Sequence, residues 1–409
     1  MTSFAQVCAE LDRRRRVTLG FERMKALLRA MGHPERDVPG LVQVVGTNGK
    51  GTTALALAAA LEEMGSPSGA YLSPHVLSYT ERVVLHGRQV TEEDFAAAMG
   101  ETMALADGEG IPVSQFEILT AGALGMFSAA ELSWVVLEAG LGARYDATSV
   151  VSPDAVVLTN VSIDHTEYLG ETVEEIAAEK LASLKPGATL FLGTDEGLIV
   201  DLARSTCRRL GARLVLACDE AGCICLPGLA PYAARDARLG LTVAESLMQR
   251  TAPAEVAQKV ALDVRAALPG RFEVHGVEGV PVVVDGGHNA AGVSAALAGM
   301  RDAYGGQPLA VVFGVLREKD IASMLAGLNR EAHSIVLTLA ESDRAADPAR
   351  IASEHGPLDR GGRRALVVEE GPVKALLVAV EAARAAAGVV LVTGSLATAA
   401  PVLRWLREA

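Results

Sequence analysis

The glycine-rich segment at residues 46–53, Gly-Thr-Asn-Gly-Lys-Gly-Thr-Thr, most constrains how this chain can fold. Residues 41–45 before it are apolar and mostly β-branched, which predicts a buried strand. Residues 54–64 after it are strong helix formers, and they end at Gly65, a residue typical of the position just past a helix. The order of strand, glycine-rich turn and helix predicts an α/β domain.

The same segment has the composition of a phosphate-binding loop. Its glycines allow backbone N–H groups to turn toward an anion, and the start of the helix adds the positive end of the helix dipole. Lys50 supplies a point charge for phosphate oxygens, and Thr52 or Thr53 supplies a hydroxyl for Mg²⁺. A turn that binds nothing is the weaker alternative, because glycines surround the lysine. We therefore predict that the phosphates of a nucleotide are bound by Gly46, Thr47, Asn48, Gly49, Lys50, Gly51, Thr52 and Thr53, and the family resemblance described below implies that this nucleotide is ATP.

Length, charge and cysteine content narrow the class of protein. With 409 residues the chain is long enough for two domains with complete cores. Its net charge of −13 argues against general binding to nucleic acids or anionic membranes. The cysteines form no C-x-x-C pair, which is typical of a reduced chain, and Cys223 and Cys225 have no second pair nearby to complete a metal site. No apolar run is long enough to span a bilayer, and none follows the arginines at 13–16. We expect a cytoplasmic protein.

Helical patterns are clearest at two places. Apolar residues at helical spacing, among them Phe21, Met24 and Leu27, predict amphipathic helix through residues 1–40. The segments Thr-Glu-Glu-Asp at 91–94 and Thr-Val-Glu-Glu at 172–175 predict helix starts closed by capping boxes.

A carboxylate and an imidazole follow two further predicted strands. Residues 134–138 form an apolar strand that ends in Glu138, and residues 155–159 precede a loop that carries His165. Ligands of open α/β sheets bind at the carboxyl ends of the strands, and a carboxylate there that faces the phosphate loop is a natural Mg²⁺ ligand. The alternatives are a glutamate that only caps the next helix and a loop histidine that is only hydrogen-bonded.

Taken together, the motifs resemble those of the folylpolyglutamate synthase/dihydrofolate synthase branch of the Mur ligase superfamily. Shared with that branch are the Lys50 loop with its extra glycine, Ser-Pro-His at 73–75, Phe-Glu-x-x-Thr at 116–120, Glu-x-Gly-Leu-Gly at 138–142, Glu-Lys at 179–180, Pro-Gly-Arg at 269–271 and His-Asn at 288–289. The chain departs from the family pattern at Ala143, Ser149, Ala233, Asp236, Gly287 and Ala290.

The resemblance implies an α/β fold in two domains. Residues 1–267 would form an ATP-binding domain with a P-loop and a doubly wound, mostly parallel sheet. Residues 268–409 would form a smaller, Rossmann-like α/β domain that binds glutamate. The dipeptide Pro269-Gly270 at this boundary is also a linker signal in its own right.

The resemblance also implies an activity, the ATP-dependent ligation of L-glutamate to a folate or dihydropteroate carboxylate through an acyl phosphate. It implies catalytic roles for Lys50, His165 and Lys180, with Lys180 converted to a carbamate. Two Mg²⁺ ions would be held by Ser73, Glu138, His165 and Thr52. Arg271, Asp285 and His288 would bind the nucleotide beside the loop, Phe116, Asp146 and Ala147 the pterin, and Arg344 the incoming glutamate.

Two other functions remain open from the sequence. The departures from the family pattern leave room for a Mur-superfamily ligase that acts on a different acid, although Phe116 and Asp146 favour a pterin. A paralogue that binds nucleotide or folate without turnover is the second, and the retained Lys50, His165 and Lys180 argue against it. We expect small-molecule substrates only, no nucleic-acid or membrane partner, and a monomer.

Overall fold

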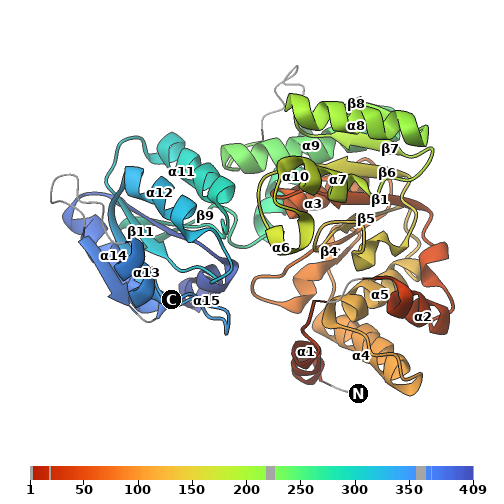
Figure 1. The fold of residues 1–409 in the computed structure, drawn as a ribbon, viewed down its shortest axis with the longest axis horizontal. Helices are drawn as coiled ribbons and strands as arrows, with labels where there is room; N and C mark the ends of the chain where they lie inside the picture. The colour runs from red at the N-terminus through yellow and green to blue at the C-terminus, as the bar shows by residue number, and fades with distance from the viewer. Residues whose placement is uncertain (1–2, 18–19, 218–225, 356–364, 370, 409) are drawn as a thin grey trace. The chain divides into compact units, whose positions relative to one another are not determined.

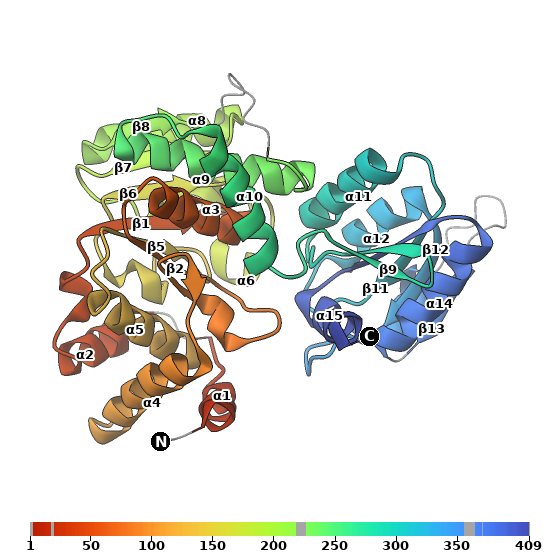
Figure 2. The ribbon, with the colours of Figure 1, turned by 180° about the vertical axis from the view of Figure 1, so that it is seen from behind.

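The computed structural model describes residues 3–17, 20–217, 226–355, 365–369 and 371–408. Its chain divides into two compact units, which are described separately below (Figures 1 and 2). The first unit extends to Gly228 and includes Ala233–Ala267, and the second comprises Leu229–Tyr232 and the chain from Leu268 onward. The prediction that Cys223 and Cys225 hold no metal lies outside the described residues.

The first unit is built on a mostly parallel sheet with the strand order β4-β3-β2-β5-β1-β6-β7-β8 in the described chain. Strand β3 pairs antiparallel with both β2 and β4, and all other neighbours are parallel. Strand β1 lies between β5 and β6, so the carboxyl ends of these three strands meet at one edge of the sheet. The strands are β1 (Gly40–Val45), β2 (Ser68–Tyr71), β3 (Val83–Leu85), β4 (Arg88–Gln89), β5 (Trp134–Glu138), β6 (Ala155–Leu158), β7 (Thr189–Leu192) and β8 (Arg213–Leu216).

Helices cover both faces of this sheet (Figures 1 and 2). Apolar residues of β2 and β5 pack against α4 (Glu92–Gly108) and α5 (Gln115–Ser128), and those of β6 and β7 pack against α7 (Val173–Leu181) and α8 (Gly197–Leu210). On the opposite face α3 (Lys50–Glu63) crosses β1, β2 and β5 and packs against α10 (Ala254–Ala267). The remaining helical elements are η2 (Tyr79–Arg82), η3 (Ala147–Val150), α6 (Thr166–Leu169) and α9 (Pro231–Met248).

The amphipathic helix predicted for residues 1–40 is present in separate pieces and not as one helix. The segment forms α1 (Phe4–Arg13), α2 (Glu22–Ala30) and the short η1 (Pro34–Arg36). After α1 the chain leaves the helical conformation and makes tertiary contacts. Arg14 makes a bidentate ion pair with Asp107, and the Arg16 guanidinium donates to the Pro112 carbonyl. These contacts outweigh local helix propensity, because propensity amounts to less than about 1 kcal/mol per residue.

The second unit contains a smaller sheet with the order β13-β12-β11-β14-β10-β9, in which only β9 runs antiparallel to its neighbour. Its core joins the sheet to α11, α12 and α13, and α14 contacts the strands and α15. The elements are β9 (Glu273–Val277), β10 (Val280–Val284), α11 (Ala290–Tyr304), β11 (Leu309–Phe313), α12 (Ile321–Glu331), β12 (Ala332–Thr338), α13 (Pro348–His355), β13 (Ala365–Glu369), α14 (Pro372–Ala385), β14 (Val389–Thr393) and α15 (Leu396–Glu408).

The predicted fold class is confirmed: a doubly wound, mostly parallel sheet is followed by a smaller α/β sheet domain. The capping box at Thr172 is present with both of its hydrogen bonds, and Thr91 caps α4 by accepting from the Asp94 N–H. Gly65 follows α3 with a φ of +80°, as predicted for that position. Within the described residues no helix has both the length and the apolar content to cross a bilayer.

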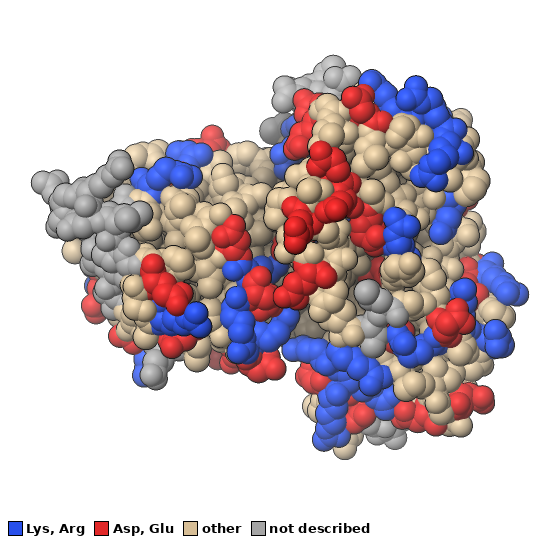
Figure 3. Space-filling model, in the orientation of Figure 1, with Lys and Arg blue, Asp and Glu red and all other residues tan. Residues whose placement is uncertain are grey.

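Charges are unevenly spread over the visible face of the first unit (Figure 3). Basic side chains gather over α1, and acidic side chains gather over α6 and α7. The exposed acidic residues there are Glu167, Glu171, Glu174 and Glu175. Because acidic side chains repel a phosphate, a phosphate ligand that binds near α6 and α7 would need positive charge from residues of the binding site itself.

Candidate active site

The segment between β1 and α3 is a rigid loop anchored to the residues that follow β6. The Thr47 hydroxyl accepts from the Ser162 N–H at 3.0 Å. The Asn48 N–H donates to the Asn160 side-chain carbonyl at 3.1 Å, and the Asn48 carbonyl accepts from the Asn160 amide at 2.9 Å and the Thr159 hydroxyl at 2.7 Å. Because β1 and β6 are neighbours, both anchor and loop lie at the same sheet edge.

Two glycines of the loop are required by backbone conformation and by space. Gly46 has a φ of +153°, and a Cβ there would lie 1.9 Å from the Thr159 Oγ1. Gly49 has a φ of +79°, and its Cβ would lie 2.3 Å from a carboxylate oxygen of Asp236 on α9. Both positions are closed to an L side chain.

Two lysines approach the loop from different elements. The Lys50 Nζ donates to the Thr47 carbonyl at 3.1 Å, and the Nζ of Lys180, from α7, donates to the Gly46 carbonyl at 2.9 Å. Lys180 is only 3 % exposed. Its burial, together with the charge of Lys50, lowers the pKa of the Lys180 ammonium from 10.5 to about 7, and Asp164 opposes this change. Lys180 therefore has a large neutral fraction near neutral pH.

The Glu138 carboxylate lies directly beside the start of α3. Glu138 ends β5, is 4 % exposed, and accepts the Ser73 N–H at 2.7 Å. A Cβ on Gly51 would lie 3.2 Å from its Oε2 and 3.6 Å from its Oε1. The glycine that follows the lysine therefore leaves the room that this carboxylate occupies. The loop at Gly51 and the Glu138 carboxylate are thus brought together, as the strand-end argument predicted, and Ser73, which only the family resemblance singled out, lies beside them.

The two threonines of the loop have different surroundings. The Thr53 hydroxyl donates to the Asp236 carbonyl at 2.9 Å, and Thr53 is completely buried. Thr52 is 3 % exposed and lies one residue after Gly51. Of the two hydroxyls that the sequence offers, the Thr53 hydroxyl is used within the fold, which favours Thr52 as the one available to a ligand.

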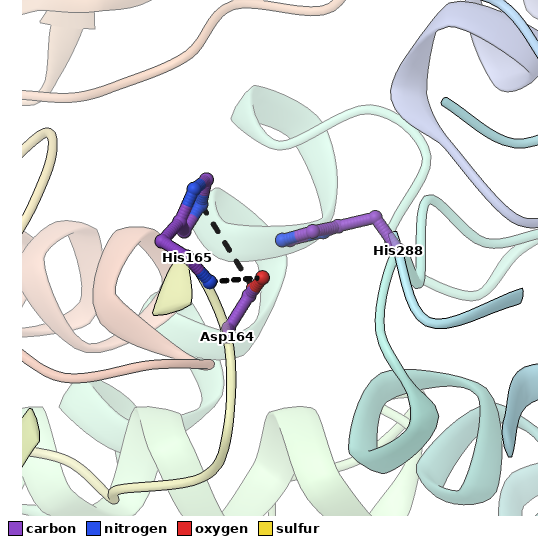
Figure 4. A group of neighbouring side chains, drawn as sticks. All are labelled: Asp164, His165 and His288. Carbon is purple, nitrogen blue, oxygen red and sulfur yellow. Dashed lines mark hydrogen bonds and ion pairs between the residues drawn. The ribbon is translucent and has the colours of Figure 1, made fainter. Parts of the chain in front are cut away.

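His165 lies in the loop after β6 and immediately precedes α6, with a φ of +52° (Figure 4). Its N–H donates to the Asp164 Oδ1 at 2.9 Å, and its Nε2 is 3.9 Å from the Asp164 Oδ2. The side chain of His165 is 42 % exposed, whereas that of Asp164 is 7 % exposed. The bonded N–H is that of the backbone, so Asp164 holds the backbone of His165, and the accessible imidazole lies close to the Asp164 carboxylate at the same sheet edge as the loop.

The residues predicted to bind a pterin meet at the segment that follows β5. Phe116, at the start of α5, packs its ring against Gly140, where a Cβ would lie 2.6 Å from the Phe116 Cζ. The Asp146 carboxylate accepts the N–H groups of Gly140 and Leu141 at 3.1 and 2.9 Å, and two further donors from Thr148. Burial raises the pKa of Asp146, and these hydrogen bonds oppose the rise. Ala147 follows it and is buried.

The loop between β2 and β3 is held by its own charged residues. The Glu81 carboxylate accepts the N–H groups of Val76, Leu77 and Ser78, each at 2.7 Å. The Arg82 Nε donates to the His75 Nδ1 at 2.8 Å. Burial and the charge of Arg82 lower the pKa of His75 to about 3, so its imidazole is neutral. Ser73 at the start of this loop is thereby fixed in place beside Glu138.

In the second unit, Asp285 follows β10 and organises the turn that begins there. It is 4 % exposed and accepts the N–H groups of Phe272 and Gly287 at 3.1 and 2.9 Å, and the Tyr232 hydroxyl. Burial raises the pKa of Asp285, and the Tyr232 bond and the charge of Arg271 oppose the rise. His288 lies three residues further along, just before Asn289, which caps α11.

Arg344 lies at the same sheet edge of the second unit as Asp285 but after a different strand. It follows β12, which is separated from β10 by β11 and β14. Its guanidinium donates to the Glu318 carboxylate at 2.8 Å, and its side chain is 61 % exposed. The structure therefore does not bring Arg344 into contact with Asp285.

Known proteins resemble this chain across both units. The Mur ligase middle domain matches residues 44–204, and the Mur ligase glutamate ligase domain matches residues 270–396. The dihydrofolate synthase/folylpolyglutamate synthase of Bacillus subtilis is 31% identical over 346 residues, which are 77% of this chain and 80% of that protein. The chain belongs to the folylpolyglutamate synthase/dihydrofolate synthase family.

Other members of the folylpolyglutamate synthase/dihydrofolate synthase family support the same placement. A crystal structure of Mycobacterium tuberculosis folylpolyglutamate synthase with ADP and AMPPCP matches with a TM-score of 0.87 and 27% identity, covering 98% of each chain. A probable bifunctional folylpolyglutamate synthase/dihydropteroate synthase of Haloferax volcanii is 35% identical over 89% of this chain. This chain spans about half of that relative, 46% of its length.

Sequence reasoning missed three residues that shape this family member's site. Asn160 and Asp164 both lie in the loop after β6, and the rule that polar residues at strand ends build sites would have found them. Asp236 was noted as a departure from the family pattern, but nothing in the sequence places its carboxylate against Gly49. That contact joins residues far apart in the chain, and only the packing of α9 reveals it.

We expect Gly46→Ala to destabilise the first unit by about 1–3 kcal/mol, because the new methyl group overlaps the buried Thr159 hydroxyl. Thermal unfolding without ATP measures the loss of stability, and the smaller rise in unfolding temperature on adding ATP measures the loss of ATP binding. The double variant Gly46→Ala/Thr159→Ala removes the overlapping oxygen and should recover part of the loss, with Thr159→Ala alone as the control. Equal stability of Gly46→Ala and the parent protein would contradict the steric argument.

Proposed function

We propose that this protein is an ATP-dependent ligase that joins L-glutamate to the carboxylate of a reduced folate or of dihydropteroate. The observation that carries the proposal is the meeting of the Lys50 loop with the buried Glu138 carboxylate at Gly51. Family membership supplies the reaction class, and the Bacillus subtilis relative carries both synthase activities in its name. A carboxylate is a poor electrophile, so its oxygen first takes the γ-phosphoryl group of ATP, and the glutamate amine then displaces phosphate from the acyl phosphate.

Residues of the first unit fit divalent metal ions. Glu138, Ser73 and Thr52 offer a carboxylate and hydroxyls, and His165 offers an imidazole whose Nε2 is 3.9 Å from the Asp164 carboxylate. Such oxygen-rich donors suit Mg²⁺. We assign one ion to Glu138, Ser73 and Thr52 and a second to His165. Bound Mg²⁺ would neutralise negative charge on the phosphates.

The remaining roles are assigned to this chain's own side chains. The N–H groups of the anchored loop bind phosphate oxygens, and Lys50 stabilises charge on the transferring phosphoryl group. Phe116 and the segment held by Asp146 and Ala147 bind the pterin ring. The roles of four residues of the second unit rest on their motifs alone: Arg271, Asp285 and His288 for the nucleotide, and Arg344 for glutamate. We assign the units to an ATP-binding domain at 1–267 and a glutamate ligase domain at 268–409.

Phosphate release tests the proposal directly. Purified protein is mixed with ATP, Mg²⁺ and L-glutamate, and either dihydropteroate or tetrahydrofolate is added. We expect phosphate release that needs glutamate and at least one of the two acids, with a product heavier by one glutamyl residue. Release with neither acid would overturn the folate assignment and favour a ligase for a different acid. Binding of dihydropteroate or tetrahydrofolate without phosphate release would indicate a paralogue that binds its ligand without catalysing a reaction.

We further propose that Lys180 reacts with CO₂ to give a carbamate. The ammonium first loses one proton to solvent. The neutral amine then forms a bond to the carbon of CO₂, one C=O π bond opens onto oxygen, and the nitrogen loses a second proton, so that a cation becomes an anion. Support comes from the surroundings of Lys180: it is buried, it lies 2.9 Å from the Gly46 carbonyl, and its pKa is about 7 rather than 10.5. At neutral pH this raises the reactive neutral fraction on the order of 10³-fold over an ordinary lysine.

Activity should therefore depend on CO₂ and should fall as the pH drops through about 7, where Lys180 becomes protonated. We expect added bicarbonate to restore activity at pH 6.5 and degassing to lower it. Lys180→Arg, which cannot lose its proton, should be inactive, and Lys180→Glu, which carries a fixed anion, should keep some activity without sensitivity to CO₂. Intact-mass spectra of rapidly trapped protein provide a second measurement. A parent enzyme whose activity does not change with CO₂ would contradict the carbamate.

The cytoplasmic location and the monomeric state of the protein stay predictions.

A further inference from the structure

A buried arginine in the first unit carries a positive charge that no carboxylate of the described residues balances in an ion pair. Arg82 is 6 % exposed and ends η2, directly before strand β3. Among the residues that the structure describes, no carboxylate forms an ion pair with it. An arginine stays charged at all physiological pH values, and burying a charge without a partner is costly. This combination indicates a place for an anion that arrives from outside the chain.

The groups that contact Arg82 are an imidazole, a hydroxyl and an aromatic ring. Its Nε donates to the His75 Nδ1, and its guanidinium bonds the Tyr71 hydroxyl and lies 5.8 Å from the centre of the Tyr79 ring. These contacts use only part of the five N–H donors of a guanidinium. Because Nδ1 of His75 accepts from Arg82, the ring proton of His75 is on Nε2, which is a second donor in the same place.

Each carboxylate in the neighbourhood is taken up elsewhere. Glu81 is turned into its own loop, where it accepts the N–H groups of residues 76–78. Asp12 accepts the Tyr79 hydroxyl at 2.7 Å and pairs with the exposed Arg15. Asp146 accepts the N–H groups of the segment after β5. Because these three carboxylates bond to other groups, the charge of Arg82 is available to a ligand.

Arg82 also lies at the correct edge of the sheet. The Leu72 N–H donates to the Arg82 carbonyl at 2.8 Å, and Tyr71 pairs with Leu137, the residue before Glu138. Arg82 and Glu138 are therefore about two strand spacings, or roughly 10 Å, apart along this edge. Ser73 and the Glu138 carboxylate lie between the phosphate loop and Arg82.

We propose that Arg82, with the Nε2–H of His75, binds the non-reacting α-carboxylate of the terminal glutamate of a folate substrate. This rests on the function proposed above. A folate carries two carboxylates on that glutamate: the γ-carboxylate reacts at the phosphate loop, and the α-carboxylate lies a few carbon atoms away. Dihydropteroate has no glutamate and presents only its reacting carboxylate. Arg82 therefore favours folates over dihydropteroate, and it acts only in the ligation of glutamate to a folate.

The test compares the two acids in one variant. Arg82→Gln should lower kcat/KM for tetrahydrofolate by about 10- to 100-fold, mainly through KM, and should change kcat/KM for dihydropteroate by less than about threefold. Arg82→Lys keeps the charge but loses the planar fork, and it should show a smaller loss confined to tetrahydrofolate. Arg88→Gln, which removes an exposed arginine from the adjoining strand, is the matched control and should behave as the parent.

Several results would overturn the assignment. An equal loss for both acids in a variant that unfolds at the parent's temperature would place Arg82 at the reacting carboxylate, and no loss for either would remove it from the site. Where the parent turns over only one acid, equilibrium binding of both acids with a non-hydrolysable ATP analogue gives the same comparison; a parent that binds no tetrahydrofolate contradicts the proposal. Failure of the parent with both acids overturns the proposed function instead.

Discussion

Replacing Lys50 by methionine should lower the rate of phosphate release about 10³-fold with little change in folding. Lys50 is the first residue of α3 and supplies the only side-chain cation within the segment at residues 46–53. Its Nζ donates to the Thr47 carbonyl, so the ammonium is held over the loop and not extended into solvent. The methionine variant keeps the aliphatic stem and loses the charge that stabilises the transferring phosphoryl group.

The loss should appear in kcat more than in ATP affinity, because the loop N–H groups and the helix dipole remain. A second effect is expected at Lys180, whose pKa is lowered partly by Lys50; without that charge its pKa should rise and the pH profile should move to higher pH. Lys259→Met, at an exposed lysine of α10 paired with Asp263, is the control. A Lys50→Met variant with the parent's rate would show that the loop does not act on the γ-phosphate.

The second large effect is expected for Glu138→Gln, which should lower kcat/KM about 10³-fold and raise the Mg²⁺ concentration needed for activity. Glutamine has the same shape and can still accept the Ser73 N–H, so the fold should persist. The loss therefore reports the negative charge of the carboxylate and not its packing. Titration of activity with Mg²⁺ and with Mn²⁺ measures the change in metal requirement.

Glu62→Gln offers a closely matched control. Glu62 lies at the opposite end of α3, and its carboxylate accepts the Ser68 N–H at 2.7 Å, the same kind of contact that Glu138 makes with Ser73. Activity of this variant should equal that of the parent, with a small loss of thermal stability. A similar loss of activity in both variants would mean that Glu138 acts through the fold. An active Glu138→Gln variant with an unchanged Mg²⁺ requirement would remove it from the metal site.

The parts of the site that the sequence predicted are those encoded locally. A β-branched strand, a glycine-rich turn and a strong helix specify the Lys50 loop within about two dozen residues, and Glu138 was found because it ends an apolar strand. Parallel strands bring such ends to one edge whatever their order. Contact between the loop and Glu138 also needs β5 to lie next to β1, and no local pattern records that neighbour.

The parts that escaped prediction depend on contacts between distant segments. The helix expected through residues 1–40 breaks because Arg14 and Arg16 bond to residues near 110. The importance of Arg82 depends on where three carboxylates point, which no local pattern records. The position of Asp236 against Gly49 likewise comes from α9 packing on α3, almost two hundred residues later in the chain.

The narrow gap between Gly51 and Glu138 has a consequence for protein engineering. A common phosphate-loop sequence places serine or threonine directly after the lysine. Grafting that residue onto position 51 would put a side chain 3.2 Å from an oxygen of Glu138 and would force either the helix start or the acid to shift. A phosphate loop of the common kind therefore cannot simply replace the loop of this protein. The residue after the lysine must leave room for the Glu138 carboxylate, and a side chain at position 51 would occupy that room.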